Sequence, residues 1–364
     1  MHRSNMSFQN QLALFLYCSL SFTLSGQVDN KANKYLGPPK EYLDADCPVA
    51  DDCIKHFVYF ARDREGIKDP LFIEQERFSG AQIMYPWSIL EPEKDSYDFS
   101  AIAEDYNYLK SHGKMLFIQL QDITFDHGFK GIPEYLATDV YDGGAIVQTN
   151  DSGKPDGWAA KRWNPKVQER FALLIMELGK AFDGKVEGIN LQETALAIDQ
   201  TIDPSFTPEA YVRGIKANML ALKMGFPQST TLQYANFMPG EWLPWEDRDY
   251  LRSIYGYGEQ IGVGLGAPDL MFERKAQLNH ALGLMHDGDF TIPLSIAVQD
   301  GNYIGKTGAD QDYHEEEDHG RPGRDNLVPQ LHAFAKEFLR VSYIFWGHQA
   351  PYFNEDLVTC LADR

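Results

Sequence analysis

The sequence is poor in basic side chains. Its 364 residues carry 33 Lys and Arg against 53 Asp and Glu, so the formal net charge is −20. Proteins that bind nucleic acid or anionic membranes need a basic surface that faces the phosphate charge. The acidic balance therefore argues against both kinds of partner. Because 43% of the residues are hydrophobic, a disordered chain is excluded and a large buried core is expected.

The motifs of several enzyme classes are also absent. No Gly-rich phosphate turn joins a predicted strand to a helix, which argues against dinucleotide binding. No Gly-x-Ser-x-Gly elbow is present, so an acyl hydrolase of that type is not indicated. No His-x-x-x-His spacing predicts a catalytic metal. We therefore expect a protein that works without a cofactor or a metal ion.

No apolar run reaches the length of about 20 residues that a membrane-spanning helix needs. The run at residues 12–22 follows a short polar start with Arg3 and precedes the small residues Ser25 and Gly26. This order of parts is typical of a secretory signal peptide. Residues 1–26 are therefore predicted to direct export to the periplasm or the medium. Their removal leaves no integral membrane segment.

Cysteine is scarce, with four residues in the chain. The residues around Cys18 fit a lipid-attachment box poorly, so a lipid anchor there is not expected. Cys47 and Cys53 precede the first predicted strand, and their spacing predicts a small disulfide loop formed in an oxidising compartment. Cys360 is then left over, or it pairs with one of these two, since the ends of a barrel meet. The spacing lacks the second Cys or His pair of a zinc site.

Short apolar runs alternate with longer amphipathic stretches from residue 56 onward. Several runs are continuously apolar, as expected for parallel strands that are covered on both faces. Eight of them predict strands, near residues 56–61, 80–86, 114–121, 185–191, 230–236, 261–266, 292–298 and 341–346. The amphipathic stretches predict helices near residues 100–112, 164–183, 208–223, 273–286 and 326–339.

Eight strands that alternate with helices predict the α/β class and a single (β/α)8 barrel over residues 56–364, preceded by an N-terminal extension over residues 27–55. A doubly wound sheet is the alternative, but it would need the missing phosphate turn. Long connections after the third and seventh strands, residues 122–163 and 299–325, are expected at the mouth where barrel enzymes build their sites. The acidic segment 314–319 suits a cation site, although a solvated loop is the favoured interpretation.

The fourth predicted strand ends in Gln192 and Glu193, which places a carboxyl group beside an amide at the barrel mouth. Active groups of barrel enzymes lie at the carboxyl ends of strands. An apolar wall raises the pKa of a carboxyl group and keeps it protonated, as a general acid requires. Glu193 is therefore the main catalytic candidate, with a structural glutamate as the alternative.

A longer motif covers the second predicted strand and the residues after it. The stretch from Tyr85 to Phe99 reads Tyr-Pro-Trp-Ser-Ile-Leu-Glu-Pro-Glu-Lys-Asp-Ser-Tyr-Asp-Phe, and a helix pattern and an apolar third strand follow it. It resembles the W-x-x-L-E-P-x-x-G-x-Y-D-F signature of clan A glycoside hydrolases. The resemblance implies a (β/α)8 barrel that cleaves glycosidic bonds with two carboxylates. It gives Glu193 the place of the acid/base and Trp346 that of a sugar-stacking tryptophan.

Two departures from the clan pattern concern the catalytic residues. Gln192 stands where the clan has Asn before the acid/base. Asp300, one methylene shorter, is the nearest carboxylate where the seventh strand of the clan carries a nucleophilic Glu. A retaining mechanism needs about 5–5.5 Å between the two carboxyl groups, and an inverting one about 6.5–9.5 Å. Asp300 can alternatively cap the following loop.

Further candidates for substrate binding are aromatic, amide and acidic residues at or just beyond strand ends. Aromatic faces pack on sugar rings, whose edges take amides and carboxylates. Asp269 lies in a turn-like context that also suits a structural aspartate, and Asp122 is a further mouth carboxylate. The predicted binding residues are Trp87, Gln121, Gln192, Tyr234, Asn236, Glu241, Asp269, Gln299, Trp346 and His348.

These features together predict an exported glycoside hydrolase that acts on an oligo- or polysaccharide with Glu193 and Asp300, by a retaining mechanism. Carbohydrate is the expected partner. A barrel that binds carbohydrate without cleaving it is the alternative, because the seventh strand lacks its Glu. A polysaccharide lyase is a third possibility, which the acidic net charge makes less attractive.

Overall fold

The computed structural model describes residues 34–362 except 36, 151–152, 199–201, 242–245, 300, 309 and 311–323. The chain divides into two units, residues 1–31 and 32–364, and every described residue belongs to the second. The predicted signal peptide therefore lies outside the described residues. Within the described part, no helix is long and apolar enough to cross a membrane.

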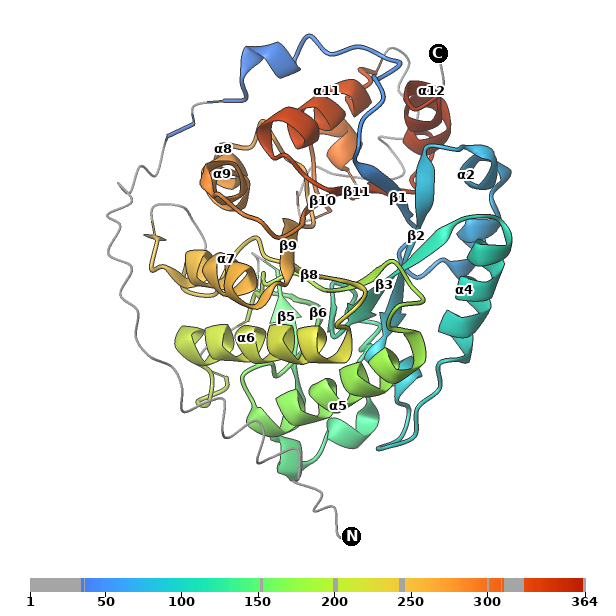
Figure 1. Ribbon diagram of the computed structural model, residues 1–364. Coiled ribbons are helices and arrows are strands. Elements are labelled where there is room, and N and C mark those ends of the chain that lie inside the picture. Colours follow the sequence, from blue (N-terminus) through green and yellow to red (C-terminus); the bar gives the residue numbers. More distant parts are fainter. Residues whose placement is uncertain are drawn as a thin grey trace. The chain divides into compact units, whose positions relative to one another are not determined.

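Eight parallel strands close into a barrel, and helices surround it (Figure 1). The predicted (β/α)8 fold is thereby confirmed. Each predicted strand overlaps an observed one, in the same order along the chain. The strands, in their order around the barrel, are β1 (Lys55–Tyr59), β2 (Phe78–Pro86), β3 (Met115–Gln121), β7 (Gly188–Leu191), β8 (Thr230–Tyr234), β9 (Gly264–Ala267), β10 (Leu294–Val298) and β11 (Tyr343–Gly347).

The helices follow the predicted pattern with some differences. The α-helices are α2 (Pro70–Glu74), α3 (Trp87–Leu90), α4 (Ser100–Ser111), α5 (Pro165–Phe182), α6 (Pro208–Gly225), α7 (Tyr250–Ile261), α8 (Lys275–Leu278), α9 (Ala281–Asp287), α11 (Val328–Ala333) and α12 (Val358–Cys360). Short 3₁₀ turns are η1 (Lys40–Tyr42), η2 (Arg64–Lys68), η3 (Glu134–Leu136), η4 (Asp139–Tyr141) and η6 (Asn302–Ile304), and π-helical turns are η7 (Phe334–Phe338) and η8 (Tyr352–Leu357).

Two helix predictions need correction. The helix expected over residues 273–286 is split into α8 and α9, because His280 has the non-helical backbone angles φ −117° and ψ −109°. At this break the side chain of Asn279 bonds both main-chain groups of Tyr35 in the N-terminal extension. Helix α7 was not predicted. Gly256 and Gly258 lower its helix propensity, but a Cβ at Gly258 would lie 2.8 Å from the carbonyl oxygen of Val263, so only glycine fits there.

Helix α5 shows how local sequence sets an element. The side chain of Asn164 accepts hydrogen bonds from the backbone N–H groups of Lys166 and Val167, at 2.9 and 3.3 Å, and Pro165 occupies the first turn. One face of the helix is buried against the barrel. Its Gly179 lets α6 approach closely, because a Cβ there would lie 2.0 Å from the carbonyl oxygen of Gly225.

The barrel interior changes from apolar to polar toward the mouth. Gln82, Gln119 and Asn190 are buried on β2, β3 and β7. The amide of Gln82 donates to Asn190 Oδ1 at 2.9 Å and to the hydroxyl of Tyr234 at 3.1 Å. A polar layer thus lies above the core. The core residues are Phe57, Phe117, Leu232, Tyr234, Ala297, Tyr343 and Phe345.

The long connection after β3 contains a small antiparallel sheet. Its strands are β4 (Ile123–Thr124), β5 (Ala145–Thr149) and β6 (Pro155–Ala160), in the order β4-β6-β5. The connection after β10 is described only in part, and the acidic segment 314–319 lies outside the described residues.

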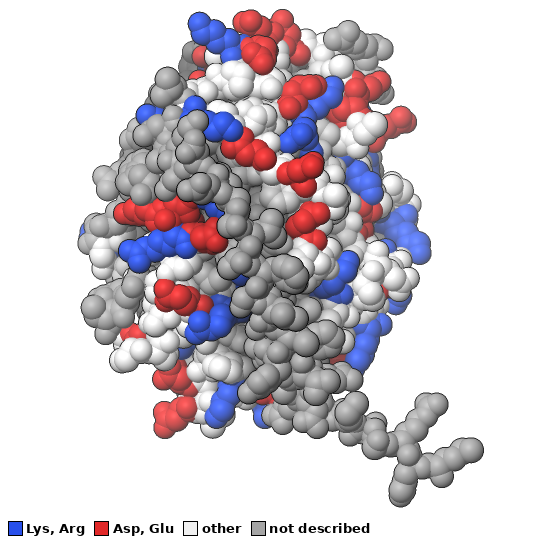
Figure 2. Space-filling view, turned by 60° about the vertical axis from the view of Figure 1, so that its left-hand side comes forward, with Lys and Arg blue, Asp and Glu red and all other residues white. Residues whose placement is uncertain are grey.

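Charged side chains of both signs are interspersed on the face of the molecule that Figure 2 shows. The described residues form no continuous basic area on this face. This distribution is consistent with the negative net charge of −20.

The disulfide joins Cys47 to Cys360, with 4.7 Å between the Cα atoms. The predicted Cys47–Cys53 loop is therefore corrected, and Cys53 is an exposed free thiol. The reason is tertiary: the N-terminal extension runs beside the C-terminal helix α12, where Val49 N–H donates to the carbonyl oxygen of Cys360 at 3.0 Å. The sequence also leaves open that Cys360 pairs with one of the two N-terminal cysteines, and the structure shows this pairing.

Replacing Cys47 by Ser should destabilise the protein, because the unfolded chain gains freedom when the two ends are no longer joined. We expect the free energy of unfolding to fall by about 2–5 kcal/mol, measured by urea unfolding without reductant. Cys53→Ser is the matched control and should leave the urea midpoint unchanged. Equal midpoints for Cys47→Ser and wild type would contradict the pairing.

Candidate active site at the carboxyl ends of the strands

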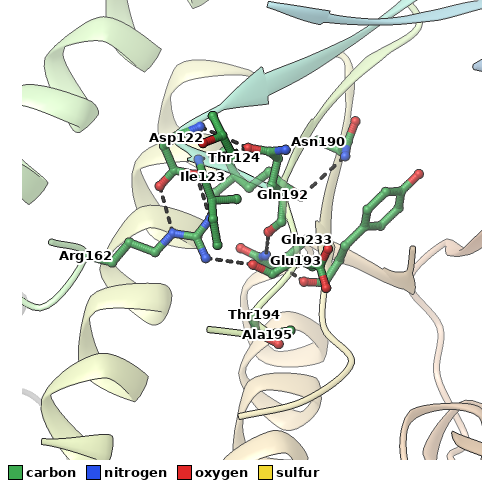
Figure 3. A network of polar contacts seen from close by, with 12 residues as sticks. Asp122, Ile123, Thr124, Arg162, Asn190, Gln192, Glu193, Thr194, Ala195 and Gln233 are labelled. Carbon is green, nitrogen blue, oxygen red and sulfur yellow. Dashed lines mark hydrogen bonds and ion pairs between the residues drawn. The ribbon is translucent and has the colours of Figure 1, made fainter. Parts of the chain in front are cut away.

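Glu193 lies two residues beyond the end of β7, and its neighbours come from the adjacent strands (Figure 3). Asn236, just after β8, donates from Nδ2 to Glu193 Oε2 at 2.7 Å. The two strands are hydrogen-bonded neighbours in the barrel. The carboxyl group therefore has a fixed position at the mouth, as the sequence predicts for its place in the chain.

The pKa of Glu193 is raised to about 7. Burial of the carboxyl group is the main cause, and the negative charge of Asp269 adds to it. The hydrogen bond from Asn236 and the positive charge of Arg162 oppose the rise. Glu193 therefore keeps its proton to a higher pH than an exposed glutamate does, which is what a general acid needs.

The residues beside Glu193 are held by side chains from neighbouring strands. Gln192 is buried, and its Oε1 accepts hydrogen bonds from the backbone N–H groups of Asp122 and Ile123, at 3.1 and 3.0 Å. Gln233 donates to the carbonyl oxygen of Gln192 at 2.7 Å. Gln192, predicted to bind substrate, thus fastens the loop after β3 to the end of β7.

Asp269 is the described carboxylate that acts on Glu193 electrostatically. It lies two residues beyond β9, and its Oδ1 accepts a hydrogen bond from Asn302 Nδ2 at 3.0 Å. Asn302 is fully buried, and its Oδ1 accepts from the backbone N–H groups of Leu270 and Gln299. This asparagine joins the ends of β9 and β10, a role that nothing in the sequence indicates.

Asp300, the predicted nucleophile, lies outside the described residues. Its neighbour Gln299 directly follows β10 and is partly exposed, with its backbone N–H 2.9 Å from Asn302 Oδ1. The end of β10 thus belongs to the same rim as Glu193 and Asp269.

Three buried amides beneath and beside the mouth have carbonyl oxygens without a hydrogen-bond partner among the described residues. They are Gln82, Gln119 and Gln121, all at most 3% exposed. A buried carbonyl oxygen needs a donor, and water or a ligand hydroxyl can supply one. Gln121 was predicted as a binding residue. Gln82 and Gln119 are not among the predicted binding residues, although a polar residue in an otherwise apolar strand is a signal that the sequence offers.

The structure does not bring the two predicted tryptophans to the mouth. Trp87 is fully buried, donates to Glu91 Oε2 at 2.9 Å and packs on Phe171. Trp346 is also fully buried, and its indole N–H donates to His56 Nδ1 at 3.0 Å. Trp346 points away from the barrel interior, because its neighbour Phe345 points into the core. Neither ring is placed to stack on a ligand at the mouth.

Glu241 is a helix cap in the structure. Its carboxylate accepts from the backbone N–H groups of Arg248, Tyr250 and Leu251, at 3.0, 2.6 and 3.2 Å. Burial alone would raise its pKa, but the nearby ring of His280 and the hydrogen bonds from this backbone hold the pKa below its usual value. The residue thus begins α7 as a carboxylate, which differs from the predicted sugar contact.

The remaining predicted residues lie in or near the rim. Tyr234 is buried at the end of β8 and accepts the hydrogen bond from Gln82 inside the barrel. His348 follows β11, bonds Asp69 Oδ2 at 2.8 Å and contacts Phe60 and Phe353. His348 keeps a quarter of its side chain exposed and can still meet a ligand.

One group of described residues has donor atoms close enough for a metal ion, Asp52, His56 and His332, all within 4.8 Å. His332 Nε2 lies 2.6 Å from Asp52 Oδ2. His56 Nδ1 accepts the indole N–H of Trp346, so Nε2 carries the proton of the neutral ring and cannot ligate a metal. The donor set therefore fits a hydrogen-bonded structural cluster.

No protein-family model matches this sequence, and no curated protein sequence does. Solved structures do match. The catalytic domain of a β-amylase from Paenibacillus polymyxa has a TM-score of 0.56 at 7% identity, over 86% of this chain and all of the other. A GH5_18 protein from Streptomyces cattleya, in complex with Manβ1-4GlcNAc, has a TM-score of 0.50 at 13% identity, over 80% of this chain and 70% of the other.

At such identities the likeness shows the fold alone. That fold is the (β/α)8 barrel that the sequence predicts, and the likeness singles out no family.

Replacing Asp269 and replacing Asn236, in separate variants, should move the pKa of Glu193 in opposite directions. Asp269→Asn removes a negative charge, so we expect the pKa to fall below about 7, and Asn236→Ala removes a bond to the carboxylate, so we expect it to rise. Carbon NMR titration of labelled glutamates measures both, with Glu193→Gln identifying the signal. Shifts of the same sign would contradict the arrangement.

Proposed function

We propose that the protein is an exported glycoside hydrolase in which Glu193 is the general acid. One observation carries this proposal: at the carboxyl end of a barrel strand, the buried carboxyl group of Glu193 is held by Asn236, and burial together with the negative charge of Asp269 raises its pKa to about 7. Glycoside hydrolysis uses one carboxyl group that is protonated and a second one that is ionised. The barrel likeness to glycoside hydrolases supports the same assignment.

In the proposed reaction, protonated Glu193 gives its proton to the glycosidic oxygen as the bond to the anomeric carbon breaks. The second carboxylate attacks that carbon and forms a glycosyl ester. Glu193, now a carboxylate, takes a proton from water, and the water oxygen displaces the ester. Proton transfer of this kind contributes about 10²–10⁴-fold to a rate. Activity should decline above about pH 7, where Glu193 loses its proton.

Asp300 is our first candidate for the second carboxylate, because it follows β10, where the clan carries its nucleophile. Asp269 is the second candidate, since its charge reaches Glu193 and Asn302 orients it. A base that activates water from a larger separation would invert the anomeric configuration, whereas a nucleophile close to Glu193 would retain it.

The ligand that fits this mouth is a neutral polyhydroxy compound. The open carbonyl oxygens of Gln82, Gln119 and Gln121 accept hydrogen bonds and cannot donate them, so they suit hydroxyl groups. With the export predicted from residues 1–26, the substrate is a glycan outside the cytoplasm.

Glu193→Gln should abolish turnover and keep glycan binding, because the amide retains the shape of the side chain and cannot give up a proton. We expect release of reducing sugar from a panel of neutral polysaccharides to fall by at least about 10²-fold. Binding measured by calorimetry should persist.

Other outcomes of this experiment favour other functions. Binding by wild type without release of sugar would favour a carbohydrate-binding barrel. A product that absorbs in the ultraviolet would favour a lyase. Full activity of Glu193→Gln would remove Glu193 from the mechanism.

A fluorinated glycoside that traps the glycosyl ester should label the second carboxylate. We expect mass spectrometry of the digested protein to find the sugar on Asp300, with Asp300→Asn as the unlabelled control. Label on Asp269 would transfer the role to that residue. A product of inverted configuration, without any label, would contradict the retaining mechanism.

A further inference from the structure

Arg162 is a buried guanidinium next to the candidate active site. It follows β6 and is 3% exposed. Its Nε donates to Asp122 Oδ2 at 2.7 Å and its Nη2 donates to Asp122 Oδ1 at 2.6 Å. This two-bond pairing fixes the plane of the guanidinium. Asp122, at the end of β3, thereby sets the orientation of Arg162 (Figure 3).

The third nitrogen of Arg162 reaches the main chain of the catalytic candidate. Nη1 donates to the carbonyl oxygen of Glu193 at 2.7 Å and to the hydroxyl of Tyr211 at 2.9 Å. Tyr211 in turn donates to the carbonyl oxygen of Thr194 at 3.0 Å. Two consecutive carbonyl groups beyond the end of β7 are thus satisfied by buried side chains, which removes their freedom to turn.

Arg162 also acts on Glu193 through its charge. The guanidinium opposes the rise of the Glu193 pKa. Asp122 compensates part of that charge because it is paired with Arg162. The charged groups that face this region are Asp269, Arg162 and Asp122, and the Tyr211 hydroxyl stays neutral because burial raises its pKa.

We propose that Arg162 and Asp122 form a positioning pair, which holds the main chain of Glu193 and balances the electric field at its carboxyl group. The proposal rests on the proposed function of Glu193 as general acid. Arg162 touches no reacting atom, so its effect passes through Glu193.

Three variants separate the geometric role from the electrostatic role. Arg162→Met removes the charge and the bonds, so the Glu193 pKa should rise by about 1 unit. Asp122→Asn leaves the guanidinium uncompensated, so the pKa should fall by a similar amount. Arg162→Lys keeps the positive charge but cannot make the two-bond pairing with Asp122. The pKa of Glu193 should therefore stay near 7, while the main chain of Glu193 is no longer held in place.

The readouts are the carbon NMR titration of Glu193 and the pH profile of kcat. The alkaline limb of the profile should move with the Glu193 pKa, upward in Arg162→Met and downward in Asp122→Asn. Arg162→Lys should lower kcat by about 10- to 100-fold through misplacement and leave KM and the alkaline limb near their wild-type values.

Two further variants test the proposal even if Arg162→Met or Asp122→Asn folds poorly. Tyr211→Phe removes one hydroxyl and keeps the packing, so it should lower kcat several-fold. Arg170→Met is the matched control: Arg170 is also buried and ion-paired, to Glu91 and Asp95, but has no contact with the Glu193 segment among the described residues. It should cost stability and leave the Glu193 pKa unchanged.

The proposal would be overturned if the alkaline limb moved in the same direction in Asp122→Asn and Arg162→Met. It would also be overturned if the alkaline limb moved in Arg170→Met. The NMR titration needs no turnover, so it reports on the pair even where no substrate is cleaved. Opposite pKa shifts with no hydrolysis would therefore refute the function and keep the electrostatic pairing. Hydrolysis with an unmoved pKa would refute the pairing and keep the function.

Discussion

The parallel closure of the barrel is the constraint on which the rest of the structure depends. All eight strands run in one direction, so their carboxyl ends meet at one rim. Glu193 and Asn236 are 43 positions apart in the chain and form a hydrogen bond of 2.7 Å because β7 and β8 are neighbours. Asp269 after β9 joins them for the same reason.

Burial at this rim has different consequences for the main chain around Glu193 and for its carboxyl group. Buried main-chain groups need partners, and Arg162, Tyr211, Gln192 and Gln233 provide them around Glu193. The carboxyl group itself remains in a poorly solvated place near another carboxylate, which raises its pKa. The same burial that demands a satisfied main chain therefore raises the pKa of the acid toward neutral pH.

The sequence pattern predicts the strands well and the direction of their side chains poorly. Both faces of a barrel strand are buried, so apolar residues occur on both and the pattern does not tell inward from outward. Trp346 points outward to His56 and its neighbour Phe345 points inward, and the continuous apolar run around them does not reveal this difference. Glu241 illustrates a second cause, since its partners in α7 lie 9 and 10 residues further on and the residue that directly precedes that helix makes no side-chain cap.

Local periodicity along the chain suffices to predict the order of strands and helices, the barrel, and the place of Glu193 at a strand end. It does not predict that Cys47 pairs with Cys360, that the charge of Asp269 acts on Glu193, or that Arg162 bonds the Glu193 carbonyl oxygen. Those outcomes depend on contacts between distant segments. Burial and the neighbours it creates set the pKa of about 7, and neither can be read from residue types along the chain.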